Sequence, residues 1–468
     1  AAPARGAMLH SLEEAPGSKK TIVLVGGGHA HAQVIKEYNW ATLPPNVQVV
    51  LVDPLKRASY SGMVPGAVAG QYAPEETQID LEMLANWAGT RFLHASVVGI
   101  DPEQRRLRLG PSPYAGADEA APEGFPEALP YDVVSFDIGS RTAFTDTPGV
   151  QEFAIATRPI HLLVRRLREK LEAFTGQVVR LVVCGAGAAG IELALTAAAR
   201  IRNAGKEAAV TLINGTEELM QGDPKRVRAA MEQVLRDRGI EVLHNTRVLR
   251  LTESEVVLDS NGTLPYDLAI WPTGAASHEV ATKLGEAGVA ITRKGWIRVK
   301  GTMQSVSHAS LFAAGDCCEF EHLQTQPGKA GVYAVRTGPV LIHNLLGFLR
   351  EEALQEYVPQ SEFLRLFNCG DGHGLGIRFG VPMVGPWVWE WKDFIDRWFM
   401  DLFKKENLPD LSGVKCSDAA QFDAALRSSV SSAPADAAVA AALLLSECAQ
   451  LAAAKDVVNM MMTDEEYR

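Results

Sequence analysis

Two segments of the chain share one pattern of hydrophobic and polar positions: a short apolar run, a glycine-rich turn and an apolar stretch with few bulky residues. Residues 21–36 read TIVLVGGGHAHAQVIK, and residues 179–200 read VRLVVCGAGAAGIELALTAAAR. Runs of β-branched residues predict strands, and the alanine-containing stretches that follow predict helices. Each segment therefore predicts a strand, a tight turn and a helix, the context in which a glycine motif indicates a dinucleotide site.

The first glycine turn has the features of an FAD site. Gly26 and Gly28 allow the backbone to bend sharply and to approach a pyrophosphate, which the free N–H groups of the following helix can bind. His31 stands at the third glycine position, so this helix must contact its strand in another way. Asp53 ends the next apolar run, where an acid can hold the ribose hydroxyls of a dinucleotide.

The second turn has all three glycines, Gly185, Gly187 and Gly190. The strand predicted after it ends in Asn214, so the sequence offers no carboxylate there for an NAD ribose and no adjacent arginine for an NADP phosphate. This segment predicts a nucleotide-binding fold for NAD(P)H, and whether a nucleotide occupies it stays open.

Three further apolar runs end in glycine: YDVVSFDIGS (131–140), YDLAIWPTG (266–274) and SLFAAGD (310–316). Their glycines are Gly139, Gly274 and Gly315. The first two runs both begin with Tyr-Asp, which suggests two domains of similar architecture. Asp316, beside glycine at a strand end, can accept hydrogen bonds from ribose or ribityl hydroxyls.

The order of these signals predicts an α/β fold with two Rossmann-like dinucleotide-binding domains, in which the NAD(P)H domain splits the FAD domain. A small C-terminal α+β region and a helical tail follow. We expect a disordered N-terminal segment at 1–20, the FAD-binding domain at 21–150 and 290–350, the NAD(P)H-binding domain at 151–289, an interface region at 351–410 and an alanine-rich helical tail at 411–468.

Composition narrows the choice of partners and compartments. The 468 residues carry a net charge of −11, which argues against nucleic acid as a partner. The six cysteines form no CxxC motif, so neither a disulfide framework nor a metal site is indicated. No apolar stretch approaches the roughly 20 residues that span a bilayer. The first residues, AAPARGA, are consistent with a chain processed in an organelle, a plastid rather than a mitochondrion, where we expect it peripheral to the membrane.

At this point the motifs resemble a known family. The chain is similar to FAD-dependent pyridine nucleotide oxidoreductases of the type II NADH dehydrogenase-like group, and most similar to the flavoproteins found alone or fused to selenide water dikinase. The segments that carry the resemblance are VLVGGGHAHAQV, SYSGMVPGAVAGQY, YDVVSFDIGS, CGAGAAGIELA, FAAGDCCEF, KAGVYAVRTGPVLIHNL and WVWEWKDFIDRWFM. The resemblance implies that FAD is bound by Gly26, Gly28, Asp53 and Asp316, and that the pyridine nucleotide site is lined by Gly185, Gly187 and Gly190.

The cysteine and glutamine content of two segments bears on the subclass. Disulfide reductases of this architecture carry a redox-active cysteine pair after the first acid, and residues 59–70, SYSGMVPGAVAG, contain none. Quinone-reducing relatives carry a glutamine-bearing motif after the flavin acid, where this chain has KAGVYAVR (329–336) without glutamine. Lys329 could offset charge on a reduced flavin, although a solvated lysine is an equal alternative.

Other polar residues near the turns give weaker indications. His29 and His31 are spaced too closely to place both rings on one helix face, so we expect no metal and a structural or flavin-contacting role for His29. Glu192 could shape the nicotinamide pocket or could be an ordinary helix residue at a domain seam. The catalytic residues are not identified by the sequence.

The C-terminal region is rich in aromatic residues. Trp387, Trp389 and Trp391 alternate as on a strand, and residues 394–402 form an apolar helical face. Core or domain-interface packing is the preferred interpretation, and docking on a membrane is the alternative. An alanine-rich helix at 435–455 is expected to dock the tail on a membrane-complex partner.

Taken together, the motifs predict an NAD(P)H dehydrogenase-like flavoprotein that passes electrons from NAD(P)H through FAD to a quinone or similar acceptor without a redox dithiol. One alternative is a flavoprotein subunit or assembly factor of an organellar membrane complex with little or no hydride transfer. A second alternative, which rests only on family association, is an accessory reductase of selenium metabolism.

Overall fold

The computed structural model describes residues 19–39, 41–114, 126–360 and 362–411. The predictions for residues 1–18 and for the tail beyond 411 therefore lie outside the described residues.

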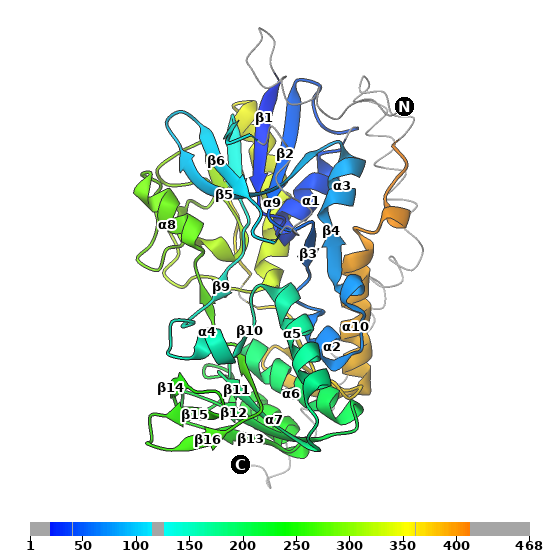
Figure 1. The fold of residues 1–468 in the computed structure, drawn as a ribbon. Coiled ribbons are helices and arrows are strands. Elements are labelled where there is room, and N and C mark those ends of the chain that lie inside the picture. Colours follow the sequence, from blue (N-terminus) through cyan, green and yellow to red (C-terminus); the bar gives the residue numbers. More distant parts are fainter. Residues whose placement is uncertain (1–18, 40, 115–125, 361, 412–468) are drawn as a thin grey trace, which may run out of the picture. The chain divides into compact units, whose positions relative to one another are not determined.

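The first glycine turn belongs to a seven-stranded sheet with the strand order β20-β8-β1-β2-β5-β6-β7 (Figure 1). The pairs formed by β20, β8, β1, β2 and β5 are parallel, and β6 and β7 extend the sheet antiparallel. The strands are β1 (Lys20–Val25), β2 (Val47–Asp53), β5 (Arg91–Asp101), β6 (Arg106–Pro111), β7 (Ala128–Pro130), β8 (Val133–Phe136) and β20 (Leu311–Ala313). Because β20 pairs with β8, a strand far along the chain completes the sheet that the N-terminal strand begins.

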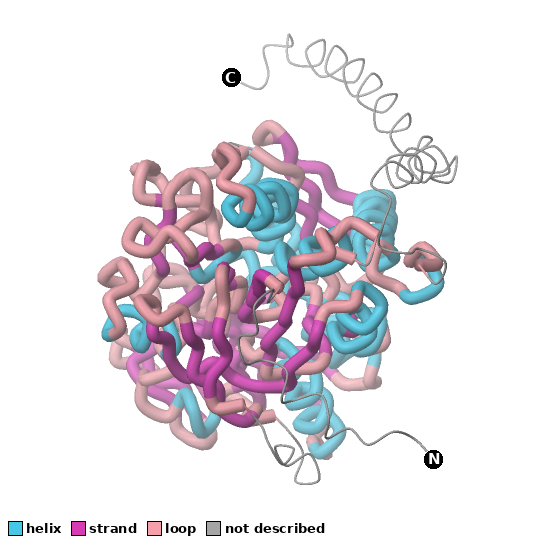
Figure 2. Tube along the Cα trace, turned by 90° about the horizontal axis from the view of Figure 1, so that it is seen from above, coloured by secondary structure: helices cyan, strands magenta, loops and turns pink. Residues whose placement is uncertain are grey.

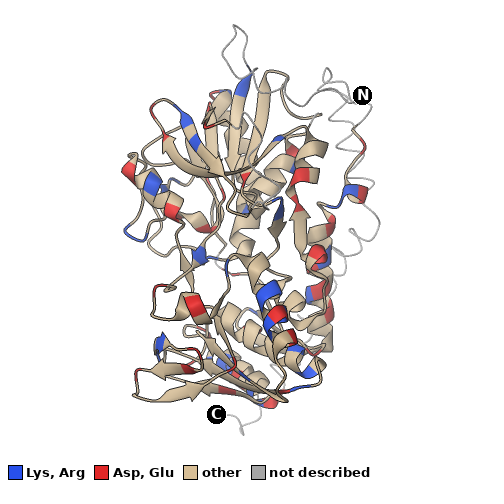
Figure 3. Ribbon diagram, viewed as in Figure 1, with Lys and Arg blue, Asp and Glu red and all other residues tan. Residues whose placement is uncertain are grey.

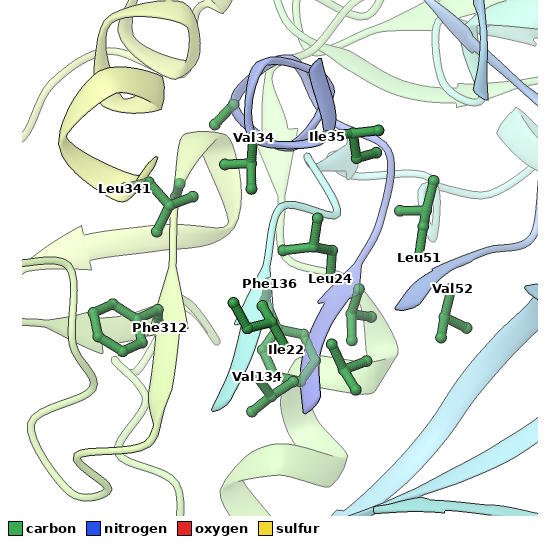
Figure 4. Packing of buried hydrophobic residues seen from close by; sticks show 14 of the residues in the cluster. Ile22, Leu24, Val34, Ile35, Leu51, Val52, Val134, Phe136, Phe312 and Leu341 are labelled. Carbon is green, nitrogen blue, oxygen red and sulfur yellow. The ribbon is translucent and has the colours of Figure 1, made fainter. Parts of the chain in front are cut away.

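Helices pack on this sheet and form its core. Helix α1 (His29–Glu37) contacts both α3 (Leu81–Ala88) and α9 (Gly331–Leu349). Figure 4 shows side chains from four parallel strands and from the two helices α1 and α9 meeting in one apolar cluster. The fully buried members include Ile22, Leu24, Leu51, Val134, Phe136, Phe312 and Leu341.

The second glycine turn belongs to a five-stranded parallel sheet with the order β10-β17-β11-β12-β13. Its strands are β10 (Ile155–Ala156), β11 (Val178–Cys184), β12 (Glu207–Ile213), β13 (Ile240–Leu243) and β17 (Leu268–Trp271). The accompanying helices are α4 (Val150–Phe153), α5 (Ile160–Ala173), α6 (Ala188–Asn203) and α7 (Lys225–Asp237). An antiparallel layer of β14 (Val248–Leu251), β15 (Glu255–Leu258) and β16 (Thr263–Pro265) follows. Figure 2 shows the strands of the structure with helices packed along them.

Short elements connect the two sheets. Strands β9 (Arg141–Thr142) and β18 (Ala275–Ala276) pair antiparallel, and helix α2 (Val64–Ala69) contacts α5 and α6. The remaining short elements are β3 (Arg57–Ser59), β4 (Gln78–Asp80), α8 (Glu279–Glu286), β19 (Ile297–Val299) and β21 (Cys318–Phe320). The predicted α/β class with two Rossmann-like sheets is confirmed, whereas the domain boundaries stay a prediction.

The C-terminal part of the described chain differs from the sequence prediction. Strands β22 (Arg365–Asn368), β23 (Gly374–Arg378) and β24 (Val381–Gly385) form an antiparallel sheet, and helix α10 (Pro386–Asp401) follows. The strand-like alternation of Trp387, Trp389 and Trp391 is wrong, because all three lie in α10. Pro386 at the first helical position starts the helix, and the rings of Trp387 and Trp391 stack with centroids 6.5 Å apart.

Candidate functional site

The first glycine turn adopts a conformation that only glycine provides at low cost. Gly26 has φ of +90°, and a Cβ on it would lie 2.4 Å from the backbone oxygen of Asp137. Gly28 is the N-cap of α1 and has no capping side chain of its own. The N-terminus of α1 thus opens at the carboxyl end of β1, where a parallel sheet binds its ligand.

His31 replaces the third glycine and ties the turn to the neighbouring strand. Its ring nitrogens lie 2.6 Å from the Gly26 carbonyl oxygen and 2.8 Å from the Ser135 hydroxyl oxygen of β8. Burial lowers the pKa of His31 to about 4, so the ring is neutral at physiological pH. The imidazole therefore makes by hydrogen bonding the contact that a glycine would make by close approach.

His29 faces a different part of the site. Its ring packs edge-on against Tyr60, with centroids 5.3 Å apart, and against Phe399 of α10 at 5.8 Å. Burial lowers its pKa to about 4, although the charge of Asp316 acts in the opposite direction. The part of the chain that the structure describes contains no group of three residues able to hold a metal ion, and none is formed around these histidines.

Asp53 lies at the end of β2, where the sequence places a ribose-binding acid. Its carboxylate accepts hydrogen bonds from the backbone N–H groups of Gly27 at 2.5 Å and Leu55 at 2.6 Å. Burial nevertheless raises its pKa to about 6. Asp53 therefore holds the glycine turn in place as well as standing at the strand end.

The structure adds Asp137, which the sequence analysis did not select. It follows β8 directly, is 3% exposed and accepts hydrogen bonds from the N–H groups of Ala30 at 2.9 Å and His31 at 3.3 Å. The signal was present in the motif FDIGS, where the acid stands two residues before the glycine that was selected.

Asp316, whose charge acts on Asp137, has two polar neighbours. The Ser140 hydroxyl donates a hydrogen bond to its carboxylate at 2.7 Å, and the Arg158 guanidinium lies 3.5 Å from the same oxygen. Gly139 and Gly315 on the adjoining turns have φ of +65° and +69°. These contacts orient the Asp316 carboxylate at the strand ends, and both polar neighbours were missed because neither lies near it in sequence.

Lys329 has partners that the sequence could not indicate. Its ammonium donates a hydrogen bond to the Cys318 carbonyl oxygen at 2.7 Å and lies 4.2 Å from the centroid of the Trp296 ring. Cys317 and Cys318 are both buried and free, and burial raises the pKa of Cys318 to about 12. Such thiols are poor nucleophiles, which agrees with chemistry that does not use a dithiol.

The second turn meets the steric demands of its motif. A Cβ on Gly190 would lie 1.8 Å from the Gly185 carbonyl oxygen, so only glycine fits the third position. Gly187 caps α6, and a Cβ on it would meet no atom within 4 Å. The same holds for Gly274, which has φ of +106°. The turn and the neighbouring strand end thus leave open space in front of α6.

Asn214, at the end of β12, uses its side chain within its own turn. Its amide nitrogen donates to the Thr216 carbonyl oxygen at 2.9 Å and lies 3.1 Å from Nδ1 of His244. Arg247 lies close to this turn in space, with its Cγ 3.7 Å from the position of a Cβ on Gly215. The sequence could not show this proximity, since Arg247 is more than thirty residues away.

A buried polar group links α10 to the first turn. Lys392 donates hydrogen bonds to Asp396 and to the Gly62 carbonyl oxygen, both at 2.8 Å, and both charged side chains are less than a tenth exposed. The Tyr60 hydroxyl donates to the same carboxylate at 3.1 Å. Since Tyr60 also packs on His29, a series of ionisable side chains extends from α10 to the start of α1.

Glu192 of α6 adds a further acid to this region. It accepts a hydrogen bond from the backbone N–H of Asn368 at 2.8 Å. Burial raises its pKa to about 7, and the charge of Lys392 acts against that rise. Burial alone would lower the pKa of Lys392, but the attraction of Asp396 and Glu192 raises it. The lysine is thus charged between two acids.

The opposite side of α10 exposes aromatic rings. Trp387, Phe394 and Trp398 are 49%, 54% and 52% exposed, and the ring of Trp391 stacks on that of Trp387. Their spacing of four, three and four residues places them on one face of the helix. The preferred interpretation of this region as core or interface packing holds only for the inner face, which includes Val388 and Phe399.

Acidic and basic positions are interspersed along the described chain (Figure 3). No helix among the described residues is both long and apolar enough to cross a membrane.

Curated relatives of the chain include quinone reductases and NADH dehydrogenase-like proteins. Demethylphylloquinone reductase NdbB of Synechocystis is 23% identical over 311 residues, which cover 64% of this chain and 72% of that protein. Type II NADH:quinone oxidoreductase of Haemophilus influenzae is 24% identical, over 48% of this chain and 57% of that protein. The chloroplastic/mitochondrial alternative NAD(P)H-ubiquinone oxidoreductase C1 of Arabidopsis thaliana is 25% identical, over 58% and 55%. The chain thus spans little more than half the length of the latter two.

Solved structures show the same fold. A sulfide:quinone oxidoreductase from Aquifex aeolicus superposes with a TM-score of 0.67 at 17% identity, over 84% of this chain and 94% of that chain. NDH2 from Plasmodium falciparum in complex with NADH gives 0.68 at 14% identity, over 84% and 99%.

A family model described as pyridine nucleotide-disulphide oxidoreductase matches residues 20–338, which is more than half of the chain. The expected oxidoreductase class, with FAD and NAD(P)H as cofactors and a likeness to type II NADH dehydrogenases, is confirmed. The chain belongs to the pyridine nucleotide-disulphide oxidoreductase family.

Proposed function

We propose that the protein passes electrons from NAD(P)H through FAD to a quinone. In this assignment residues 21–150 and 290–350 hold FAD, and residues 151–289 hold the nicotinamide nucleotide. FAD, when bound, supplies the two-electron chemistry, and the protein supplies binding, orientation and protons. Both glycine turns support this, since each has the backbone conformation and the open helix N-terminus that a dinucleotide needs.

The twelve cofactor-binding residues named from the sequence keep this role in the proposal. For FAD they are Gly26, Gly28, His29, Asp53, Gly139, Gly315, Asp316 and Lys329, and for NAD(P)H they are Gly185, Gly187, Gly190 and Gly274. The structure adds Ser140 and Arg158, which contact the Asp316 carboxylate.

The observation that carries quinone as the acceptor is the buried chain of Tyr60, Asp396 and Lys392 beside His29. Reduction of a quinone to a hydroquinone takes up two electrons and two protons, whereas a hydride brings two electrons and only one proton. The second proton must come through the protein or from water. A phenol, a carboxylate and an ammonium in contact can form a route for that proton. A buried ion pair often adds no net stability to a protein, so stability alone does not explain why this pair is present.

The relatives named above act on quinones, which supports the same acceptor. The cyanobacterial and the chloroplastic or mitochondrial relatives support our proposal of a plastid location. The other candidates, a flavoprotein subunit without hydride transfer and a selenium-metabolism reductase, have no comparable support from the site.

We further propose that the exposed aromatic face of α10 rests on the membrane surface, where a lipid-soluble quinone is found. Tryptophan is favoured at the membrane interface, and one face of α10 presents three tryptophans and a phenylalanine. The tail at 411–468 is proposed separately as the segment that docks on a membrane-complex partner.

Vesicle binding tests the α10 face. Replacing Phe394 and Trp398 with serine should reduce co-sedimentation with anionic phospholipid vesicles by roughly tenfold or more, since each buried large side chain contributes about 1.5–3 kcal/mol. Flavin content should not change, because both side chains point away from the core. The matched control replaces Val178 of β11 and Leu249 of β14 with serine. These side chains are 42% and 53% exposed and lie outside α10, so the control should bind vesicles as the unmodified protein does.

A truncation after Leu411 separates the two anchors. Vesicle binding should persist in the truncated protein. If binding is lost on truncation and unaffected by the Phe394 and Trp398 substitutions, the tail is the anchor and the proposal for α10 is wrong.

A further inference from the structure

Asp137 is a buried acid at the turn that the proposed function assigns to FAD. Its carboxylate accepts hydrogen bonds from the N–H groups of Ala30 and His31 in the first turn of α1. These are among the unpaired N–H groups that make a helix N-terminus attractive to a phosphate. A protein carboxylate therefore already lies at the positive end of the helix.

The surrounding backbone encloses this carboxylate closely. A Cβ on Gly28 would lie 2.2 to 2.3 Å from its carboxylate atoms, and a Cβ on Gly315 would lie 2.6 Å from one of its oxygens. Both glycines thus leave room for the acid as well as for a cofactor. Asp137 is 3% exposed, so water does little to screen its charge.

No cationic side chain of the described residues makes a hydrogen bond or ion pair with Asp137. The charged and titratable groups around it on the surrounding elements are two acids, two histidines and two thiols. Beyond them, Arg158 lies 3.5 Å from the Asp316 carboxylate, and Lys329 donates a hydrogen bond to the Cys318 carbonyl oxygen. These acids, histidines and thiols are Asp53, Asp316, His29, His31, Cys317 and Cys318. Both histidines are neutral, so only the backbone N–H groups of Ala30 and His31, and no cationic side chain bonded to it, offset a charge on Asp137.

We infer that the protonation state of Asp137 sets the affinity of the protein for FAD. The inference rests on the proposed function, since it takes the first turn as the pyrophosphate site. With Asp137 neutral, the helix end is free to stabilise the anionic pyrophosphate. With Asp137 ionised, its charge takes up the same N–H groups and repels the phosphates.

The pH dependence follows from the sign of the shift. Burial raises the pKa of Asp137 to about 7. The acid is therefore protonated below neutrality, and the bound pyrophosphate raises its pKa further because it disfavours a second negative charge. FAD affinity should consequently be highest below pH 7 and should fall as the pH rises above it.

The test measures flavin release from the purified full-length protein. The holoprotein is diluted at pH 6 and at pH 8, and the fluorescence of released FAD gives its dissociation constant. For the unmodified protein we expect a dissociation constant about tenfold larger at pH 8 than at pH 6, because the protonated fraction of an acid with a pKa of about 7 falls about tenfold over this interval. Asp137→Asn keeps an acceptor for the α1 N–H groups but carries no charge. The dissociation constant of this variant for FAD should differ less than about twofold between pH 6 and pH 8.

Two controls make the result specific. Asp132→Asn removes an acid next to the other end of β8 and should keep the full pH dependence. Asp53 is present in every variant, so any contribution that it makes to the pH dependence is the same in all of them. At pH 8, Asp137→Asn should hold FAD more tightly than the unmodified protein. Equal pH dependence in Asp137→Asn and in the unmodified protein would overturn the inference, whereas failure of the unmodified protein to bind FAD at either pH would overturn the proposed function.

Discussion

Replacing Asp316 with alanine is expected to leave the purified protein with less than about a tenth of the flavin found in the unmodified protein. The Asp316 carboxylate is oriented by Ser140 and Arg158 toward the strand ends. A hydrogen bond to a charged group contributes about 1.5–3 kcal/mol, so loss of this acceptor weakens binding roughly tenfold to a hundredfold. The measurement is the flavin-to-protein ratio after gel filtration.

The matched control is Glu321→Ala, which removes a nearby acid that pairs with Arg298 at the surface. It should retain full flavin content. If Asp316→Ala also retains full flavin while its fold is intact, Asp316 does not hold FAD and the assignment of this strand end is wrong.

Replacing Lys392 with methionine is expected to destabilise the protein by about 3–5 kcal/mol, because Asp396 would remain buried without its cation. The side chain of Asp396 is 6% exposed, so water cannot take the place of the lysine. The Gly62 carbonyl oxygen would lose a hydrogen-bond donor as well. The thermal unfolding midpoint of the holoprotein should fall by several degrees.

The double variant Lys392→Met/Asp396→Leu distinguishes a buried charge from lost packing. It removes both charges and should recover most of the midpoint, since replacing a whole buried pair with apolar side chains is often neutral. It should nevertheless reduce quinones more slowly than the unmodified protein, because the proposed proton route is gone. A double variant that is less stable than Lys392→Met would contradict the account of this pair.

The two glycine turns were predictable because each is encoded within one short segment. The strand, the turn and the helix follow one another along the chain. The atom that excludes a side chain at Gly190 is the carbonyl oxygen of Gly185, only five residues earlier. Even the exception, His31, lies inside its motif. Its compensating partner, Ser135, could not be foreseen, because it lies on the neighbouring strand more than a hundred residues later.

The rest of the site depends on contacts between distant segments. Lys392 and Asp396 are four residues apart in an aromatic stretch, but only the fold shows that they are buried against Tyr60. The alternation of Trp387, Trp389 and Trp391 predicted a strand where the structure has a helix. A period of two over three residues cannot be distinguished from a helix, and the proline that starts α10 was the better signal.

The most direct test of the proposed function is anaerobic mixing of the purified protein with NADH and, separately, with NADPH, while flavin absorbance near ~450 nm is followed. The account predicts that at least one nucleotide lowers this absorbance and that a soluble quinone then restores it. Gly190→Ala should keep its flavin but lose the response to the nucleotide, since its new Cβ would lie 1.8 Å from the Gly185 carbonyl oxygen. Unchanged absorbance with both nucleotides, in protein that carries its flavin, would contradict hydride transfer and favour a flavoprotein subunit without this activity.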